Sequence, residues 1–393
     1  MNTSQAQTEN YSFIEGGLFR KVQVKLGVQN HQAVLAVAGI CFAWLPLFIF
    51  SLLDGKLWTN ASVPFLHDIA AQARFLVALP VFFLIRNTID LKTTAVIKYM
   101  TVSLLDAEEQ QRMLTVVLPR MRRWACSSIT EWIMILIVVG SAWGLVQKVG
   151  YGGLQGDGIN WRFVGLPADN VLSLAGKWAA FISIPFFQFL LLQWVWRYIV
   201  WMLLLFNFAK AKLILLPTHA DRSGGIGILI LAQRSFSLIF ATVSIVLSGQ
   251  LIVYVFNSKE NLQMVGGIGI GFILLCLILL LLPLLFFMGK LVRIKQVGLL
   301  KLSRLASEIS TKFEKEWLNN TVIEKRIEDQ QVDPSMAYDY SCLYDLLQQF
   351  RVIPIVPRDI IGLAITIALP FIPILFVYFS AVEVLQKIIG LLL

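Results

Sequence analysis

Residues 265–289 read VGGIGIGFILLCLILLLLPLLFFMG and contain no charged side chain. A helix needs about 20 apolar residues to cross the hydrocarbon core of a bilayer, so this stretch predicts a membrane span. Six further stretches are similarly apolar, at 33–53, 69–86, 127–147, 178–205, 226–256 and 360–381. Because lipid offers no partner for unpaired backbone groups, each should be helical. The sequence therefore predicts an all-α, polytopic membrane helix bundle with about seven transmembrane helices.

The composition agrees with a membrane protein. Hydrophobic residues make up 57% of the chain and charged residues 15%, against about 45–50% and about 25% in soluble domains. The net charge of +9 is explained by retention of Lys and Arg beside the cytoplasmic face, so we expect the lipid bilayer as a partner and no nucleic acid. The four cysteines include no CxxC pair and the chain has only three histidines, so we expect no metal and no cofactor.

Basic residues alternate between the loops. The loops on one side carry 24 Lys and Arg and those on the other side carry six, which predicts a cytoplasmic N-terminus and an external C-terminus. No cleavable signal peptide is visible. The expected segments are a cytoplasmic N-terminal segment at 1–32, a transmembrane region at 33–289 with six spans and a cytoplasmic helical insert at 87–125, a cytoplasmic helical region at 290–358, and a seventh transmembrane helix with a short external tail at 359–393.

The second span gives the weakest signal. Its apolar part runs only from Phe75 to Ile85, with Arg74 just before it and Arg86 just after it. A re-entrant segment is therefore an open alternative to a full span, and such segments usually line a cavity.

Two cytoplasmic helical segments are expected. The first, at 87–125, contains a start that resembles a capping box at Asp106 and Glu109. It should end near Pro119 and the basic stretch at 120–124. The second should present one apolar face and end at Asp333-Pro334. That face consists of Leu302, Leu305, Ile309, Phe313 and Trp317. It could pack within a small helical cap, or it could bind a partner or a second copy of the chain, so a homo-oligomer stays open.

Charged side chains inside spans are costly and usually face a partner or a water-filled cavity. Glu131, Arg197 and Arg234 are all expected in the cytoplasmic half of the membrane, where they would leave an excess of positive charge. Glu131 could form a structural pair with one arginine, and Arg197 could extend to the headgroups. The sharper hypothesis is a site for an anion or a proton.

The loop Pro217-Thr-His-Ala-Asp-Arg-Ser-Gly-Gly-Ile-Gly227 joins the fourth and fifth spans. The start of a helix carries unpaired N–H groups and can bind a phosphate or a carboxylate. Ser223 could cap the helix, and Arg222 could assist as a bidentate donor. An ordinary turn and cap is the alternative. The candidate binding residues here are His219, Asp221, Arg222, Ser223, Gly224 and Gly225.

A third group of candidates lies at the outer end of the second span. His67 and Arg74 are seven residues apart, so they would share a face of one helix, and Asp68 lies beside His67. We expect Arg74 to pair with a different helix.

The element His67-Asp68…Arg74-Phe-Leu-x-Ala-x-Pro80, together with Pro217-Thr-His-x-Asp-Arg-x-Gly-Gly225, resembles a group of uncharacterised bacterial multi-pass inner-membrane proteins. The corresponding loop of that group usually reads His-Pro-Asp-Arg, where this chain has Ala220. The resemblance implies a bacterial cytoplasmic membrane and brings no activity with it.

The leading functional hypothesis is a channel or transporter for a small anionic solute. Arg222 and the glycine-rich helix start would attract the anion, while Arg197 and Arg234 would replace its hydration deeper in the membrane and Glu131 would limit how tightly it is held. One alternative is an integral membrane enzyme that acts on a lipid or phosphate-bearing substrate, with His219 as acid or base. Another is a membrane effector or assembly protein that is signalled through its cytoplasmic helices. The sequence favours a non-enzymatic protein over an enzyme.

Overall fold

The computed structural model describes residues 24–25, 27, 31–58, 61, 63–150, 160–164, 171–258, 262–315 and 334–378. Regular structure within these ranges is helical, and no strand longer than an isolated bridge occurs in them. Seven helical segments are long and apolar enough to cross a membrane. They are Gln32–Leu53, Ile69–Ser103, Ala107–Gly144, Leu174–Lys210, Leu229–Val255, Gln263–Leu285 and Pro357–Ile374. The predicted class, an all-helical bundle with seven candidate spans, is confirmed.

The elements follow one another in a simple order. The first candidate span comprises α3 (Gln32–Ala43) and α4 (Leu45–Leu53), and the second comprises α5 (Ile69–Gln72), η2 (Ala73–Ala78) and α6 (Leu79–Ser103). The third comprises α7 (Ala107–Arg112), η3 (Met113–Val117), α8 (Leu118–Ala125) and α9 (Ser128–Gly150). The fourth comprises α10 (Leu174–Trp178), η5 (Ala179–Ser183) and α11 (Ile184–Lys210). The rest comprise α12 (Leu229–Ser258), α13 (Leu262–Leu285), α14 (Met288–Phe313), α15 (Pro334–Gln348), α16 (Pro357–Ala368), η8 (Leu369–Phe371) and α17 (Ile372–Tyr378).

Three of the long helical segments contain a π-helical turn that ends two residues before a proline. The turns η2, η3 and η5 precede Pro80, Pro119 and Pro185. Proline has no N–H group and its ring crowds the preceding turn, and a wider turn accommodates both effects. The helix therefore continues past Pro119 and through the basic stretch to Ala125, where the predicted segment 87–125 ends. The second span is likewise one continuous helix from Ile69 to Ser103 rather than a re-entrant loop.

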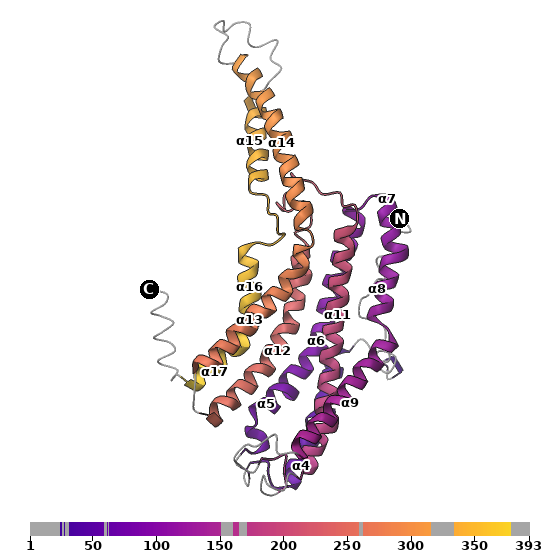
Figure 1. Cartoon of the computed structure of the whole chain (residues 1–393), viewed down its shortest axis with the longest axis vertical. Helices are drawn as coiled ribbons and strands as arrows, with labels where there is room; N and C mark the ends of the chain where they lie inside the picture. The colour runs from indigo at the N-terminus through magenta and orange to yellow at the C-terminus, as the bar shows by residue number, and fades with distance from the viewer. Residues whose placement is uncertain are drawn as a thin grey trace.

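Helix α12 lies at the centre of the bundle, where it packs against α5, η2, α6, α13 and α16. Its approach to the second span is close, because a Cβ atom added at Gly249 would lie 2.8 Å from the Cβ atom of Ala73. On the other side of the bundle, α11 lies beside α8 and α9 (Figure 1). The Phe236 ring of α12 also contacts Tyr198 and Trp201 of α11. A change in the position of α12 would therefore alter its packing against the second, fourth, sixth and seventh spans.

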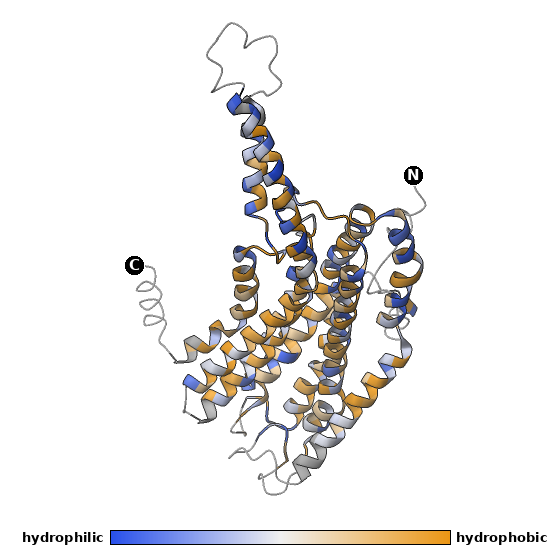
Figure 2. Ribbon diagram, turned by 45° about the horizontal axis from the view of Figure 1, so that its top comes forward, coloured by the Kyte–Doolittle hydropathy of each residue, from blue (hydrophilic) through white to orange (hydrophobic). Residues whose placement is uncertain are grey.

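Helices α14 and α15 form a hairpin that projects beyond the bundle (Figure 1). Figure 2 shows hydrophobic residues concentrated in the bundle and many hydrophilic residues on this hairpin. Ile309 of α14 is buried with Tyr340 of α15, and Leu302 packs against them, whereas Leu305 is 46% exposed. The predicted apolar face therefore packs within the hairpin only in part. The side chain of Phe313, all of Trp317 and the predicted helix end at Asp333 lie outside the described residues.

Candidate functional site

The loop between α11 and α12 is organised around the carboxylate of Asp221. Its Oδ1 atom accepts hydrogen bonds from the backbone N–H groups of Ser223 (2.9 Å) and Gly225 (3.0 Å), and its Oδ2 atom accepts one from Gly227 (2.8 Å). The Nδ1 atom of His219 lies 2.8 Å from Oδ1. The backbone donors that were expected to receive an external anion therefore bind a carboxylate of the same loop.

The pKa of Asp221 follows from these contacts. Burial alone would raise it, but the three backbone donors and His219 outweigh burial and hold the pKa below its ordinary value of 3.8. A group with a lowered pKa contributes stability above its ordinary pKa and loses that contribution as the pH falls through the lower value. Asp221 therefore stays ionised near neutral pH, and the loop should keep its form there.

The backbone of this loop turns tightly around the carboxylate. Arg222, Gly224 and Gly225 have φ angles of 53°, 69° and 96°, in the left-handed region that favours glycine. Ser223 is not the cap of the fifth span, since α12 begins only at Leu229. Its buried Oγ atom has no hydrogen-bond partner among the residues that the structure describes. The prediction of a Ser223 cap is wrong, because residues 224–228 separate this serine from the first residue of α12.

The loop between α11 and α12 also forms hydrogen bonds with the base of the α14–α15 hairpin. The backbone N–H of Arg351 donates to the carbonyl of Arg222 and its guanidinium donates to the carbonyl of Asp221, both at 2.7 Å. From α14, the ammonium of Lys295 donates to the carbonyls of Gln348 (3.0 Å) and Phe350 (2.9 Å). We call these contacts the hairpin joint. They connect α14 and α15 to the residues that immediately precede α12.

A shallow hollow of about 360 Å³ lies between this loop and α14. Leu215 and Pro217 line it from the loop, and α14 contributes the cationic side chains of Arg293 and Lys301. This hollow brings two positive charges beside the hairpin joint.

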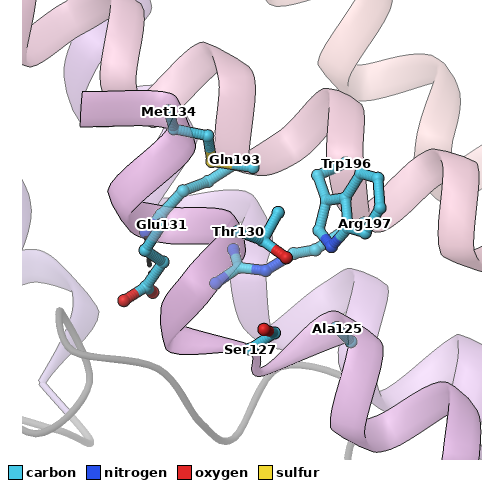
Figure 3. A pocket seen from close by; sticks show the side chains of 8 residues that line it. All are labelled: Ala125, Ser127, Thr130, Glu131, Met134, Gln193, Trp196 and Arg197. Carbon is cyan, nitrogen blue, oxygen red and sulfur yellow. Dashed lines mark hydrogen bonds between the residues drawn. The ribbon is translucent and has the colours of Figure 1, made fainter. Parts of the chain in front are cut away.

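Glu131 and Arg197 come together, as the sequence had left open. Glu131 accepts a hydrogen bond from Gln193 (3.3 Å), and the Arg197 guanidinium lies 5.0 Å from the ring centroid of Trp194. Figure 3 shows the side chains of Glu131 from α9 and Arg197 from α11 in one pocket. Its volume is about 10 Å³, and about 10–15 Å³ is needed for one water. The pocket as it stands is too small for a hydrated anion.

Charged groups of both signs surround this pocket. The carboxylates of Glu131 and Asp90 act on the charge of Arg197. The carboxylate of Glu131 and the guanidinium groups of Arg197, Arg122 and Arg86 act on Cys126. Asp90 of α6 is therefore a second carboxylate beside this pocket, and the expected excess of positive charge stays a prediction.

Arg234 lies in a different ion pair. Its guanidinium donates to the carboxylate of Asp359, which lies near the start of α16. The side chain of Asp359 is only 12% exposed. Arg234 and Arg197 therefore do not share one binding site. Asp359 was not among the residues predicted from the sequence. It immediately precedes the predicted span at 360–381, and a charged residue so close to the end of a span was the signal that could have indicated it.

We expect Arg234→Gln to lower the stability of the folded protein, because it leaves Asp359 buried without its partner. A broken buried pair costs about 3–5 kcal/mol. The Arg234 side chain is 52% exposed, so the expected loss is smaller, about 1–2 kcal/mol. The double variant Arg234→Gln/Asp359→Asn should lose less than the two single variants together, as measured by thermal unfolding in detergent. Additive losses would show that the pair is not coupled.

Asp68, from the predicted group of His67, Asp68 and Arg74, holds two segments of the chain together. It is buried and accepts hydrogen bonds from the backbone N–H of Ala71 (3.0 Å), from the indole of Trp161 (2.9 Å) and from the guanidinium of Arg162 (2.8 Å). It thereby caps α5 and ties the chain at 160–164 to the start of the second span. Nothing near Asp68 in the sequence indicated Trp161 and Arg162 as partners, because both come more than 90 residues later.

The expected face shared by His67 and Arg74 is not formed. His67 ends a separate 3₁₀ turn, η1 (Phe65–His67), and is exposed. Arg74 lies in η2, with its guanidinium 5.9 Å from the ring centroid of Phe75. Asp68 stands between the two elements, so one continuous helix does not carry both side chains.

Comparisons of the chain with protein-family models, with curated proteins and with solved structures found no match. No relative therefore lends an activity to this chain. Its function has to be inferred from the Asp221 loop, the hairpin joint and the intramembrane charges.

Proposed function

We propose that the protein is a membrane effector or assembly protein that is signalled through its hairpin. A partner on the α14–α15 hairpin would change the position of the hairpin, and the hairpin joint would pass that change to α12. We further propose a bacterial cytoplasmic membrane, with the N-terminus and the hairpin in the cytoplasm and the C-terminus outside, in line with the basic loops and the resemblance.

The hairpin joint is the observation that carries this proposal. Several polar groups of the loop form hydrogen bonds within the chain, since the Asp221 carboxylate accepts from the loop's own N–H groups and Arg351 donates to two of its carbonyls. The loop leads into α12, which contacts the second, fourth, sixth and seventh spans. The hairpin also exposes Leu300 (72%) and Tyr338 (70%), which are suitable contacts for a partner.

Photo-crosslinking in living cells tests the proposal. A photoreactive amino acid would replace Leu300, Leu305 or Tyr338 on the hairpin, and a matched control would carry it at Glu108, an exposed position of α7. A discrete adduct from the hairpin positions and none from Glu108 is the expected result. An adduct of twice the mass of the chain would identify the partner as a second copy. Hairpin positions that give no adduct would contradict the proposal.

A second candidate is the passage or binding of a small anionic solute, and the hollow beside Arg293 and Lys301 favours it. The intramembrane arginines support it less, because Arg234 pairs with Asp359 and the pocket beside Arg197 has a volume of only about 10 Å³. If this candidate is correct, anion flux into liposomes should fall in Arg293→Gln/Lys301→Gln and persist in Arg304→Gln, an exposed neighbour on α14. No flux with correctly inserted wild-type protein would remove the candidate. The enzyme alternative, with His219 beside Asp221, stays a prediction.

A further inference from the structure

Helices α8 and α9 meet at an elbow that carries a basic hollow. Helix α8 ends at Ala125 and α9 begins at Ser128. The hollow at this elbow has a volume of about 500 Å³ and is lined by Arg120, Arg123, Trp124 and Ser127. Its size suits a headgroup rather than a single ion.

The positive charges of Arg120 and Arg123 in this hollow are not paired with a carboxylate within the described part of the chain. Helix α8 contains Arg120, Arg122 and Arg123 and no acidic residue. Among the residues that the structure describes, neither Arg120 nor Arg123 has an ion pair. An Arg side chain with free N–H groups is well matched to a phosphate, which can accept two parallel hydrogen bonds from it.

The surface next to the hollow is apolar. On the first turns of α9, Ile129 is 72% exposed, Trp132 62% and Leu136 75%. The spacing of three to four residues places these three side chains on one face of the helix. In a membrane span such a face contacts acyl chains. The indole N–H of Trp196 meanwhile donates to the carbonyl of Trp124 at 2.9 Å, which holds α8 against α11 beside the hollow.

We propose that the elbow between α8 and α9 is a binding site for an anionic phospholipid. The phosphate group lies between Arg120 and Arg123, and an acyl chain lies along Ile129, Trp132 and Leu136. Basic residues beside a span on the side predicted to be cytoplasmic attract the anionic lipids of that leaflet. This site does not depend on the function proposed for the hairpin.

Lipid titration of the purified full-length chain, followed by native mass spectrometry, tests the site. Phosphatidylglycerol and phosphatidylcholine with the same acyl chains are compared on wild type and on Arg120→Gln/Arg123→Gln. Each arginine should account for roughly a fivefold change, so phosphatidylglycerol should bind the double variant about 25-fold more weakly. Phosphatidylcholine, whose choline offsets the phosphate charge, should lose much less affinity. The matched control is Arg112→Gln on α7, where the arginine is 62% exposed and pairs with Glu109 at 3.3 Å.

Three outcomes would overturn the assignment. Wild type could bind both lipids equally, or the double variant could keep the full preference for phosphatidylglycerol. Inorganic phosphate at millimolar concentration could also displace phosphatidylglycerol, which would make free phosphate the ligand. Melting temperatures measured in phosphatidylcholine show whether each variant is folded. The variant Arg120→Lys/Arg123→Lys keeps both charges, so it should retain part of the preference for phosphatidylglycerol if the site is correct.

Discussion

Replacing Asp221 by alanine is expected to loosen the loop between α11 and α12 and to free the base of the hairpin. The substitution leaves three backbone N–H groups without their acceptor. Hydrogen bonds to a charged group contribute about 1.5–3 kcal/mol each, so we expect a loss of about 3–4 kcal/mol after allowing for the partial exposure of the side chain. The apparent melting temperature in detergent should fall by roughly 5–10 °C.

Asp106→Ala is the matched control for this change. Asp106 also accepts a backbone N–H, but only one, from Glu109 at 2.9 Å, so its loss should cost about 1 kcal/mol. Asp221→Asn, which keeps one acceptor oxygen, should fall between the two. If Asp221→Ala were no less stable than Asp106→Ala, the carboxylate would not be what holds the loop.

Replacing Asp68 by alanine is expected to have an effect of similar size at the other group of candidates. The change removes the cap of α5 and leaves the guanidinium of Arg162 and the buried indole of Trp161 without their acceptor. Removing one partner from a buried ion pair costs about 3–5 kcal/mol. Thermal unfolding in detergent would measure this loss, and limited proteolysis at 160–164 would show whether that segment has been released.

The neighbouring variant His67→Ala provides the control. His67 is exposed and lies in the separate turn η1, so its loss should stay within about 0.5 kcal/mol. The double variant Asp68→Ala/Arg162→Ala should recover part of the loss, because no cation is then left unpaired. Equal effects of Asp68→Ala and His67→Ala would contradict the role of Asp68 as an anchor.

The seven spans could be predicted because the preference of an apolar helix for lipid is a local property that adds up along the chain. The cap at Asp106 could be predicted for the same reason, since its partner lies three residues away. The π-helical turns were not foreseen, because a proline can end a helix, kink it or follow a wider turn, and the tertiary packing decides among these.

The candidate sites were harder because their partners come from distant parts of the chain. Residues 219–225 were predicted to bind an external phosphate or carboxylate, but in the structure the backbone N–H groups of the loop donate to Asp221. The hydrogen bonds to Asp221 depend on the left-handed turn at Arg222, Gly224 and Gly225. The sequence allowed this turn but did not require it. The partners Asp90 and Asp359 depend on helix order, which one sequence leaves open.

The most direct measurement for the central claim is a spin-label distance between Ser307 on the hairpin and Glu108 on α7, by double electron–electron resonance in nanodiscs. Both positions are exposed, and the four native cysteines would first be replaced. We predict one narrow distance distribution in wild type and in the control Arg304→Gln, and a broad one in Arg351→Gln/Lys295→Gln, which removes side-chain donors of the hairpin joint. A wild type as broad as that variant, or a variant as narrow as wild type, would contradict the claim that the joint couples the hairpin to the bundle.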